Sequence, residues 1–420
     1  MGVSVIAMSA GLRIFLFFSF GYFVSYLFRG VNIGFAPYLT SELNLSAADL
    51  GMLTSLYFLG FALAQIPAGI LLDTWGPRRV NAGLMVLAAV GTVVFGLSHG
   101  LPGLMLGRLL LGLGVAVCLG ASFQAIAQTF PLARLPLING LVMAVGGMGG
   151  VAVGAPLTAL LQIVDWRTVS CGLAVLTLGV SALIFFGARP AAGTHPARAG
   201  RRPTMAEQMR GTRQLLRDPA YWRIVSLSVA SSGAFYAVQS LWVKPYLLDV
   251  SQVSPTRAAG LVSVLGFAMV AGNICLGSLV RRVERWGMSL YVFGGLNMVV
   301  FMGVQIVIMA GTPLPLALLW TAYGVFGSSN ILVYALLAER FPGPMLGRVN
   351  TTTNLLIFIM IFLCQIGIGW IVDLWPAQGG HYPAQAHLTA WGVVLALQAG
   401  GALWYFWPSR RAARPRAGRA

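Results

Sequence analysis

Arg29 has the most distinctive chemistry in this sequence, because its charged side chain lies well inside a long apolar run. An α-helix rises about 1.5 Å per residue, so Arg29 lies about 20 Å beyond Ile14, inside a hydrocarbon core about 30 Å thick. Arginine stays protonated in proteins. Two interpretations are open: the guanidinium extends to the interface or pairs with another helix, or it binds an anion beside a water-filled path.

Helical spacing favours the anion-binding interpretation, since polar side chains recur on one side of this segment. Tyr22, Ser25, Arg29 and Asn32 follow one another at intervals of three or four residues, which places them on one helix face. Further polar residues at mid-helix depth either contact a ligand or form hydrogen bonds between helices. These residues are Gln65, Tyr236, Gln239, Asn273, Asn330, Tyr334, Asn354 and Gln365.

Few other residues could support reaction chemistry within the apolar segments. The ten acidic residues and four histidines lie in or beside loops or at helix ends. Proton coupling through a mid-membrane carboxylate is therefore not supported, and exchange or uniport is the expectation. A membrane-embedded enzyme would need a buried nucleophile with a base, paired acids or metal ligands, so we expect no enzyme. The four cysteines lie in apolar segments, and we predict no cofactor, metal or disulfide.

Lys244 is the only lysine in the chain and lies towards one end of an apolar segment. It either adds a second positive charge for an anion or extends its ammonium group to the membrane interface. Arg108 also lies within an apolar segment, about two turns from the expected outer surface. Arg108 either donates hydrogen bonds to carbonyl groups of the first helix or handles substrate or protons, and both roles stay open.

The composition shows which elements must position these residues. The chain has 420 residues, of which 58% are hydrophobic and 9% charged, whereas soluble domains carry about 25% charged residues. This is the composition of an integral membrane protein. Its apolar runs are much longer than the strands of about ten residues in membrane barrels, so an all-α protein is predicted.

The positions of the basic residues explain the net charge of +17. They cluster in a central loop, in the C-terminal tail and on alternate short loops, which is the positive-inside pattern of a membrane protein. We therefore predict a multi-pass protein of the plasma membrane with both termini in the cytoplasm, and we expect no nucleic acid partner. The first eleven residues lack a cleavable signal pattern. The expected partners are the lipid bilayer and a small anionic molecule, and a monomer is expected.

Twelve apolar segments are predicted, in two sets of six. The first six cover residues 12–36, 47–72, 80–98, 102–130, 137–161 and 167–188, and the second six cover residues 220–247, 256–280, 288–310, 315–340, 347–374 and 387–408. The predicted domains are a first six-helix bundle at 1–188, a basic cytoplasmic linker at 189–219, a second bundle at 220–408 and a basic tail at 409–420.

The two sets of segments resemble each other. The sequence Pro37-Tyr38-Leu39 recurs as Pro245-Tyr246-Leu247, at an offset of 208 residues. The same offset relates Gln65 to Asn273 and Gly69 to Gly277. Several matches at one offset indicate an internal repeat. Two pseudo-symmetric six-helix bundles with a binding site between them near the midplane are a transporter architecture.

The segment from Gly69 to Arg79, GILLDTWGPRR, resembles the signature of the major facilitator superfamily between its second and third helices. Arg108-Leu-Leu-Leu-Gly112-Leu-Gly114 is similar to that superfamily's pattern in its fourth helix. The resemblance implies alternating access of two bundles. It also implies that Asp73, with Gly76, Arg78 and Arg79, controls the cytoplasmic gate near Gly347 and Arg348, where a helix N-terminus attracts an anion.

Residues 26–79 resemble the anion:cation symporter family and the glycerol-3-phosphate:phosphate antiporters, which implies an anion-binding role for Arg29, with Asn32 and Gln65 as neighbours. The chain departs from those families at Phe28, Gln65, Val115 and Ala237, where they carry acidic or basic residues. One fixed cation in place of three argues against an organophosphate and favours a singly charged anion such as a monocarboxylate. Drug or metabolite efflux is the alternative, although Ala155 stands where drug antiporters of the superfamily have glycine.

Overall fold

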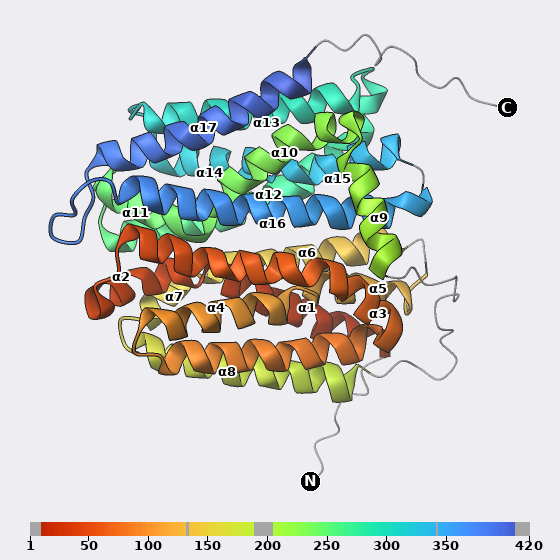
Figure 1. Ribbon diagram of the computed structural model, residues 1–420, viewed down its shortest axis with the longest axis horizontal. Coiled ribbons are helices and arrows are strands. Elements are labelled where there is room, and N and C mark those ends of the chain that lie inside the picture. The colour runs from red at the N-terminus through yellow and green to blue at the C-terminus, as the bar shows by residue number, and fades with distance from the viewer. Residues whose placement is uncertain (1–9, 132–133, 189–204, 342, 408–420) are drawn as a thin grey trace.

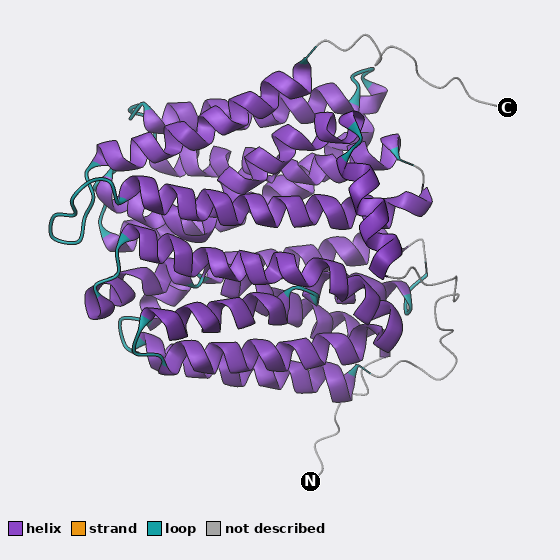
Figure 2. Cartoon of the chain, viewed as in Figure 1, coloured by secondary structure: helices purple, strands orange, loops and turns teal. Residues whose placement is uncertain are grey.

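The computed structural model describes residues 10–131, 134–188, 205–341 and 343–407 of the chain. Helices make up nearly all of these residues (Figure 2). The described part of the chain contains no strand, apart from one isolated bridge between Gln378 and His381. Eleven helical stretches are long and apolar enough to cross a membrane, and Leu137–Ala152 is a shorter apolar helix.

The helices form two groups, which Figure 1 shows as a lower group in red to yellow and an upper group in green to blue. The first group contains α1 (Ala10–Gly30), α2 (Asn32–Leu43), α3 (Ala47–Leu97), α4 (Leu101–Val115), α5 (Cys118–Ala127), α6 (Leu135–Ala152), α7 (Ala155–Leu160), α8 (Trp166–Ala182) and the π-helical turn η2 (Leu183–Gly187). Several predicted spans are thus built from two consecutive helices, such as α1 with α2 and α6 with α7.

The second group follows the short helix α9 (Met205–Leu216). It contains α10 (Pro219–Ala237), η3 (Val238–Trp242), α11 (Val243–Asp249), α12 (Pro255–Arg285), α13 (Leu290–Met309), α14 (Leu316–Gly327), η4 (Ser328–Asn330), α15 (Ile331–Arg340), α16 (Gly343–Val372) and α17 (Ala384–Phe406). We call the end of the protein that carries α9 the proximal end. The opposite end, where residues 44–46 and 373–383 connect helices, is the distal end (Figure 1).

The structure differs from the sequence prediction in α3, which was expected as two spans separated by a loop. Helical geometry continues on both sides of Gly76, and only this residue leaves it, with φ of +77° and ψ of 161°. Glycine tolerates positive φ without a steric penalty, and Pro77 fits the first turn of the next helical segment. One residue therefore breaks the helix where a longer loop was predicted.

Glycines let the helices of the first group approach closely. A side-chain carbon at Gly112 would lie 2.0 Å from the carbonyl oxygen of Tyr57, so α4 and α3 touch through their backbones. A side-chain carbon at Gly107 would lie 2.8 Å from the carbonyl oxygen of Gly91 on the other arm of α3. Small residues at such crossings are the main means by which membrane helices pack, because lipid supplies no hydrophobic drive between them.

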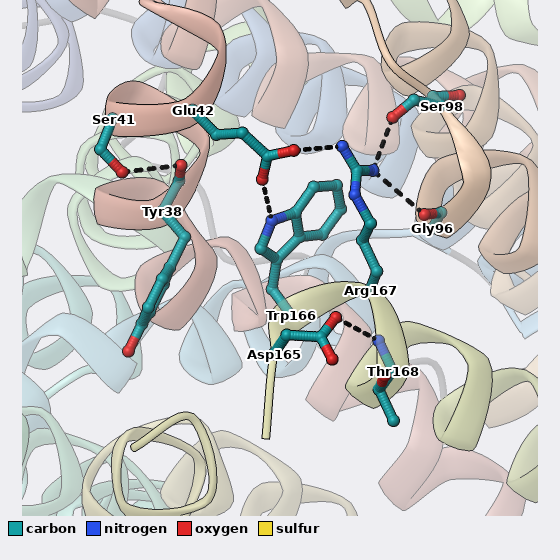
Figure 3. A network of polar contacts seen from close by, with 9 residues as sticks. All are labelled: Tyr38, Ser41, Glu42, Gly96, Ser98, Asp165, Trp166, Arg167 and Thr168. Atoms are coloured by element: carbon teal, nitrogen blue, oxygen red, sulfur yellow. Dashed lines mark hydrogen bonds and ion pairs between the residues drawn. The ribbon is translucent and has the colours of Figure 1, made fainter. Parts of the chain in front are cut away.

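A polar network fastens the distal end of the first group (Figure 3). Glu42 at the end of α2 accepts hydrogen bonds from Trp166 Nε1, at 2.8 Å, and from Arg167. Arg167 also donates to the carbonyl oxygens of Gly96 and Ser98 at the end of α3. The network thus ties the ends of α2 and α3 to the start of α8 and satisfies backbone carbonyls that a helix end leaves unpaired.

The two groups touch each other closely on the distal side. A side-chain carbon at Gly51 of α3 would lie 2.8 Å from the carbonyl oxygen of Gln365 on α16. On the other seam, Ser263 of α12 accepts a hydrogen bond from Ala155 N at 2.9 Å and donates to Val151 O at 3.2 Å. These contacts join α3 to α16 and α6–α7 to α12.

The proximal end of the same helices is packed differently. A side-chain carbon at Gly69 of α3 would have no atom within 4 Å, and the same holds for Gly277, its counterpart on α12, and for Gly347 near the start of α16. For the glycines of the described chain, close contact between the two groups is therefore found from the middle of the helices, at Gly147 beside Val270, to the distal end.

The crossing at Gly112 gives a test of this packing. Gly112→Ala should lower the free energy of unfolding by about 1 to 3 kcal/mol, because its methyl group collides with the Tyr57 carbonyl oxygen. Thermal unfolding of the purified protein, followed by tryptophan fluorescence, measures the change. Gly172→Ala is the matched control, since no atom lies within 4 Å of that position. Equal unfolding temperatures for the two variants would show that the crossing is not tight.

Candidate functional site

Arg29 lies in the last turn of α1, where aromatic rings from both groups of helices surround its guanidinium. The guanidinium carbon is 4.4 Å from the ring centroid of Tyr26 and 5.2 Å from that of Tyr236. The centroids of Phe61 and Phe358 lie at 5.8 and 5.7 Å, and these two rings stack on each other at 4.1 Å. Elements α1, α3, α10 and α16 therefore converge on one cation.

The charge of Arg29 has little compensation from the protein. Its side chain is buried, and the Nε atom has no hydrogen-bond partner. The ion pairs formed among the described side chains do not include Arg29. A cation–π contact stabilises a charge by about 0.5 to 2 kcal/mol, whereas burial of an ion costs several kcal/mol. An anion that reaches the guanidinium would supply the missing compensation.

Phenol groups provide further hydrogen-bond donors beside Arg29. The ring of Tyr22 packs edge-on against that of Tyr26, with centroids 5.1 Å apart, and the rings of Tyr26 and Tyr236 both face the guanidinium. Tyr22 and Tyr26 belong to α1, and Tyr236 belongs to α10, so both groups of helices contribute phenol groups. Phenol hydroxyls can turn to donate to an anion, and together with the guanidinium they form a site suited to negatively charged oxygen atoms.

The polar stripe predicted on the first helix divides into two parts in the structure. Ser25 turns away from the site, because its hydroxyl donates to Val115 O on α4 at 3.4 Å. Asn32 lies beyond the end of α1, in the first turn of α2, where its Nδ2 donates to Thr54 Oγ1 on α3 at 2.8 Å. The Oδ1 atom of Asn32 is buried without a partner. Only Tyr22 and Arg29 of the stripe lie in the aromatic cluster.

Two glutamines of the second group occupy the seam on the distal side of Tyr236. Gln239 is buried and lies against Gly150 of α6, and its Oε1 atom has no hydrogen-bond partner. Gln365 is fully buried, donates weakly to Ser240 Oγ at 3.5 Å and also has an Oε1 atom without a partner. These amides sit between the two groups with unused hydrogen-bonding capacity.

The remaining predicted contacts are spread more widely. Tyr334 donates a hydrogen bond to Asn354 Oδ1 of α16. Gln65 on α3 and Asn273 on α12 are half-buried and form no hydrogen bond with another described residue. The side chain of Asn330 lies outside the described residues. The structure therefore brings Arg29 and Tyr236 into direct contact, whereas the other predicted side chains that the structure describes are not bonded to Arg29.

Arg108 is buried like Arg29 but has a backbone partner. Its Nη1 donates to Phe28 O of α1 at 3.1 Å, and its guanidinium lies 5.3 Å from the ring centroid of Tyr57. Tyr57 in turn donates to Ser25 O at 3.0 Å. This geometry is that of the first alternative for Arg108, hydrogen bonding to carbonyl groups of the first helix. Such bonds satisfy carbonyls that the break after Gly30 leaves unpaired.

Lys244 lies in α11 and is also largely buried, with 6% of its surface exposed. It forms no ion pair or hydrogen bond with a described residue. The buried position differs from that of a lysine whose ammonium group extends to the membrane interface.

The predicted gate residues lie at the proximal end, where Asp73 and Arg79 are exposed and Gly76 and Arg78 are half-buried. Asp73 accepts a hydrogen bond from Gln124 Nε2 of α5 at 3.4 Å, and Arg78 donates to Phe185 O of η2 at 3.0 Å. Arg79 is exposed, and Gly76 provides the break between the arms of α3. The guanidinium of Arg348 lies against Gly211 of α9 rather than against Asp73.

The sequence analysis missed most of the aromatic rings around Arg29. Tyr26 could have been found, because it lies three residues before Arg29 and thus on the same helix face. Phe61 and Phe358 gave no usable signal, since phenylalanines within membrane spans are common and mostly form the core. Their contact joins α3 to α16, and only packing of the two groups places them at one cation.

The contrast between the two buried arginines yields a prediction. Arg108→Met should lower the unfolding temperature, because Phe28 O would lose its donor inside the protein. Arg29→Met should leave the unfolding temperature unchanged or raise it, because it replaces an incompletely compensated charge with an apolar side chain. Thermal unfolding of both variants without added anions tests this. A large destabilisation by Arg29→Met would show that Arg29 has a structural role.

Comparison with known proteins is consistent with this architecture. The sequence model of the Major Facilitator Superfamily matches residues 18–365. A probable sulfoacetate transporter of Cupriavidus necator is 23% identical over 348 residues, covering 79% of this chain and 81% of its own length. A putative tartrate transporter of Agrobacterium vitis is 26% identical over 278 residues, covering 62% of each chain.

Solved structures share the fold. A bacterial homologue of the human lysosomal transporter Spinster, in an inward-facing and occupied conformation, has a TM-score of 0.72 at 17% identity and covers 94% of this chain and 95% of its own. The D-xylose–proton symporter has a TM-score of 0.72 at 14% identity, covering 95% and 98%. The predicted all-α fold with two bundles is confirmed, and the prediction that the protein is a transporter and not an enzyme is confirmed. The chain is a membrane transporter that belongs to the major facilitator superfamily.

Proposed function

We propose that this transporter carries a small organic anion, with Arg29 as the group that binds its negative charge. The observation that supports this most strongly is the buried guanidinium at the meeting point of both helix groups, with hydroxyl donors beside it and no acidic partner among the described residues. A neutral or cationic substrate would leave that charge uncompensated. A carboxylate or sulfonate would accept hydrogen bonds from it.

The position of Arg29 between the two groups fits alternating access. We propose that residues 1–188 and 220–408 move as two bodies, joined by residues 189–219. In this structure the bodies touch closely at the distal end, through Gly51 with Gln365 O and through Ser263 with Val151 O. Separation of these seams, with closure at the proximal end, would transfer access to Arg29 from one side of the membrane to the other.

The distribution of charge supports an orientation. Basic residues of the described chain at the proximal end include Arg78, Arg79, Arg210, Arg213, Arg282 and Arg348. An excess of arginine at one side marks the cytoplasmic face of a membrane protein. The distal end is then the outer face, both termini lie in the cytoplasm, and the present arrangement is closed to the outside.

The relatives support the chemical class of the substrate. Proteins named as a probable sulfoacetate transporter, a putative tartrate transporter and a probable anion transporter of Arabidopsis thaliana chloroplasts are similar to this chain. All three names refer to anions.

Because no carboxylate of the described chain pairs with Arg29, the positive charge stays in the site through the cycle, and exchange or uniport of the anion is proposed.

Ligand binding gives a direct test of the role of Arg29. The purified protein should be stabilised by at least one member of a panel of carboxylates, sulfonates and phosphates, since a ligand at 100 times its Kd adds about 2.7 kcal/mol. Arg29→Gln should abolish this thermal shift and the uptake of the same anion into proteoliposomes, while Arg257→Gln, an exposed arginine, should retain both. An unchanged shift in Arg29→Gln would refute the site.

A second test concerns the gate. Asp73→Asn should slow transport several-fold while the affinity for the anion changes little, because Asp73 lies at the proximal end, away from the aromatic cluster. Initial rates over a range of anion concentrations separate the two effects. Unaltered turnover would remove Asp73 from the gating mechanism.

A further inference from the structure

Three titratable side chains that are far apart in the sequence meet at the distal end of the second group. Asp249 ends α11, His381 lies in the connection between α16 and α17, and His387 lies in the first turn of α17. Asp249 Oδ1 is 2.6 Å from His381 Nδ1, and Asp249 Oδ2 is 2.8 Å from His387 Nε2. One carboxylate therefore accepts hydrogen bonds from two imidazole rings.

The three side chains differ in burial, and this difference determines which of them can exchange protons with solvent. Asp249 is 6% exposed and His387 is 1% exposed, whereas 63% of the His381 side chain is exposed. Solvent protons can therefore reach His381 directly. The ring of His387 lies 6.3 Å from that of Tyr246, and its Nδ1 atom has no hydrogen-bond partner. His387 therefore binds the carboxylate of Asp249 from the protein interior, and His381 binds it from the side that faces solvent.

Asp249 also binds the connection at residues 373–383, which contacts the first group of helices through Tyr382. Asp249 Oδ2 also accepts a hydrogen bond from the backbone N–H of Tyr382, at 3.3 Å. The Tyr382 hydroxyl accepts from Ala47 N, in the first turn of α3, at 3.0 Å and donates to Asp373 Oδ1 at 2.8 Å. Partial burial raises the pKa of Tyr382 to about 12, so it stays a neutral phenol. Tyr382 thus bridges from the second group to the first at the distal seam.

We propose that Asp249, His381 and His387 form a proton-binding site whose occupancy holds the distal end closed through the Tyr382 bridge. A carboxylate can only accept hydrogen bonds, so His381 must donate in either protonation state. Protonation of the ring adds the attraction of a positive charge to this hydrogen bond, because the imidazolium then faces the negative carboxylate. The docked position of residues 373–383 therefore gains stability when a proton binds.

The direction of the pH effect follows from linkage. A histidine that gains a carboxylate partner binds its proton more tightly in the docked state than in the released state. Lowering the pH through the histidine range then shifts the population towards the docked state, and raising it releases the Tyr382 bridge. The other titratable groups facing the site are Tyr246 on α11, Asp373 after α16 and Tyr382 itself. Tyr382 stays neutral over this range, because partial burial raises its pKa to about 12.

This inference concerns a proton site separate from Arg29 and does not depend on the identity of the transported anion. The proton site contains a carboxylate and two imidazoles, whereas the described rings around Arg29 belong to tyrosines and phenylalanines, and the proton site lies at the outer face if the proposed orientation holds. Acidification outside the cell would then hold the transporter closed towards the outside.

Hydrogen exchange of the Ala47 amide measures the bridge without any substrate. In lipid nanodiscs, exchange of the peptide containing Ala47 should be about tenfold slower at about pH 5.5 than at about pH 8, after correction for the intrinsic rate. His381→Gln keeps a neutral donor without a titratable ring and should remove this pH dependence. Asp249→Asn should remove it as well.

Two controls make the result decisive. Tyr382→Phe lacks the hydroxyl that accepts from Ala47 N, so exchange should be fast at both pH values. His99→Gln, which changes an exposed histidine at the distal end outside the site, should behave as the unmodified protein. The proposal fails if His381→Gln and Asp249→Asn retain the full pH dependence, or if Ala47 exchange in the unmodified protein does not depend on pH. Anion binding in the thermal-shift assay is unaffected by either outcome.

Discussion

The constraint that shapes this protein is the presence of a permanent positive charge in a region that water does not solvate freely. Arg29 cannot lose its proton, and burial of an ion costs several kcal/mol. Four aromatic rings surround the guanidinium, and two of them carry phenol hydroxyls, but no carboxylate of the described residues pairs with it. Under the proposed function, an incoming anion recovers the remaining deficit, so the free-energy cost of burying this charge becomes a source of binding free energy.

Arg108 shows that a buried arginine alone does not make such a site. It lies on α4 at similar burial, yet its guanidinium donates to Phe28 O at the end of α1. Arg108 thereby helps to fix the break between α1 and α2, immediately beside Arg29. Arg108 donates one hydrogen bond to the backbone, although its Nε and Nη2 atoms have no partner, whereas Arg29 faces the seam between the two groups. Close glycine crossings such as Gly112 against Tyr57 O make the frame rigid enough to keep both in place.

The distal seam combines two kinds of contact with different properties. Contacts of backbone against backbone, such as Gly51 with Gln365 O, depend only on shape. The bridge from Tyr382 to Ala47 N depends on a charged cluster around Asp249 and can respond to solvent. A seam of this composition can be tightly packed and still be regulated. Its polar part contributes a free energy that changes with protonation, while the packing contribution stays the same.

The sequence alone determined the class of membrane protein, the apolar helical segments, the internal repeat and the position of Arg29 inside one of those segments. Long apolar runs, loops rich in arginine and residues at matching offsets follow from the chain order, because the bilayer selects helices of a given length and composition. Chain order could not show that Ser25 turns towards α4, that one glycine replaces a loop at Gly76, or that Phe61 and Phe358 stack beside Arg29.

Only the tertiary structure joined Asp249 to His381 and His387, which looked in the sequence like unrelated residues in or beside loops or at a helix end. Helical periodicity reports which residues share a face, but it carries no information about which helix lies opposite. That choice is made by packing between segments hundreds of residues apart. For this reason the buried charge of Arg29 was visible from the sequence, whereas the aromatic rings around it and the cluster of Asp249, His381 and His387 were not.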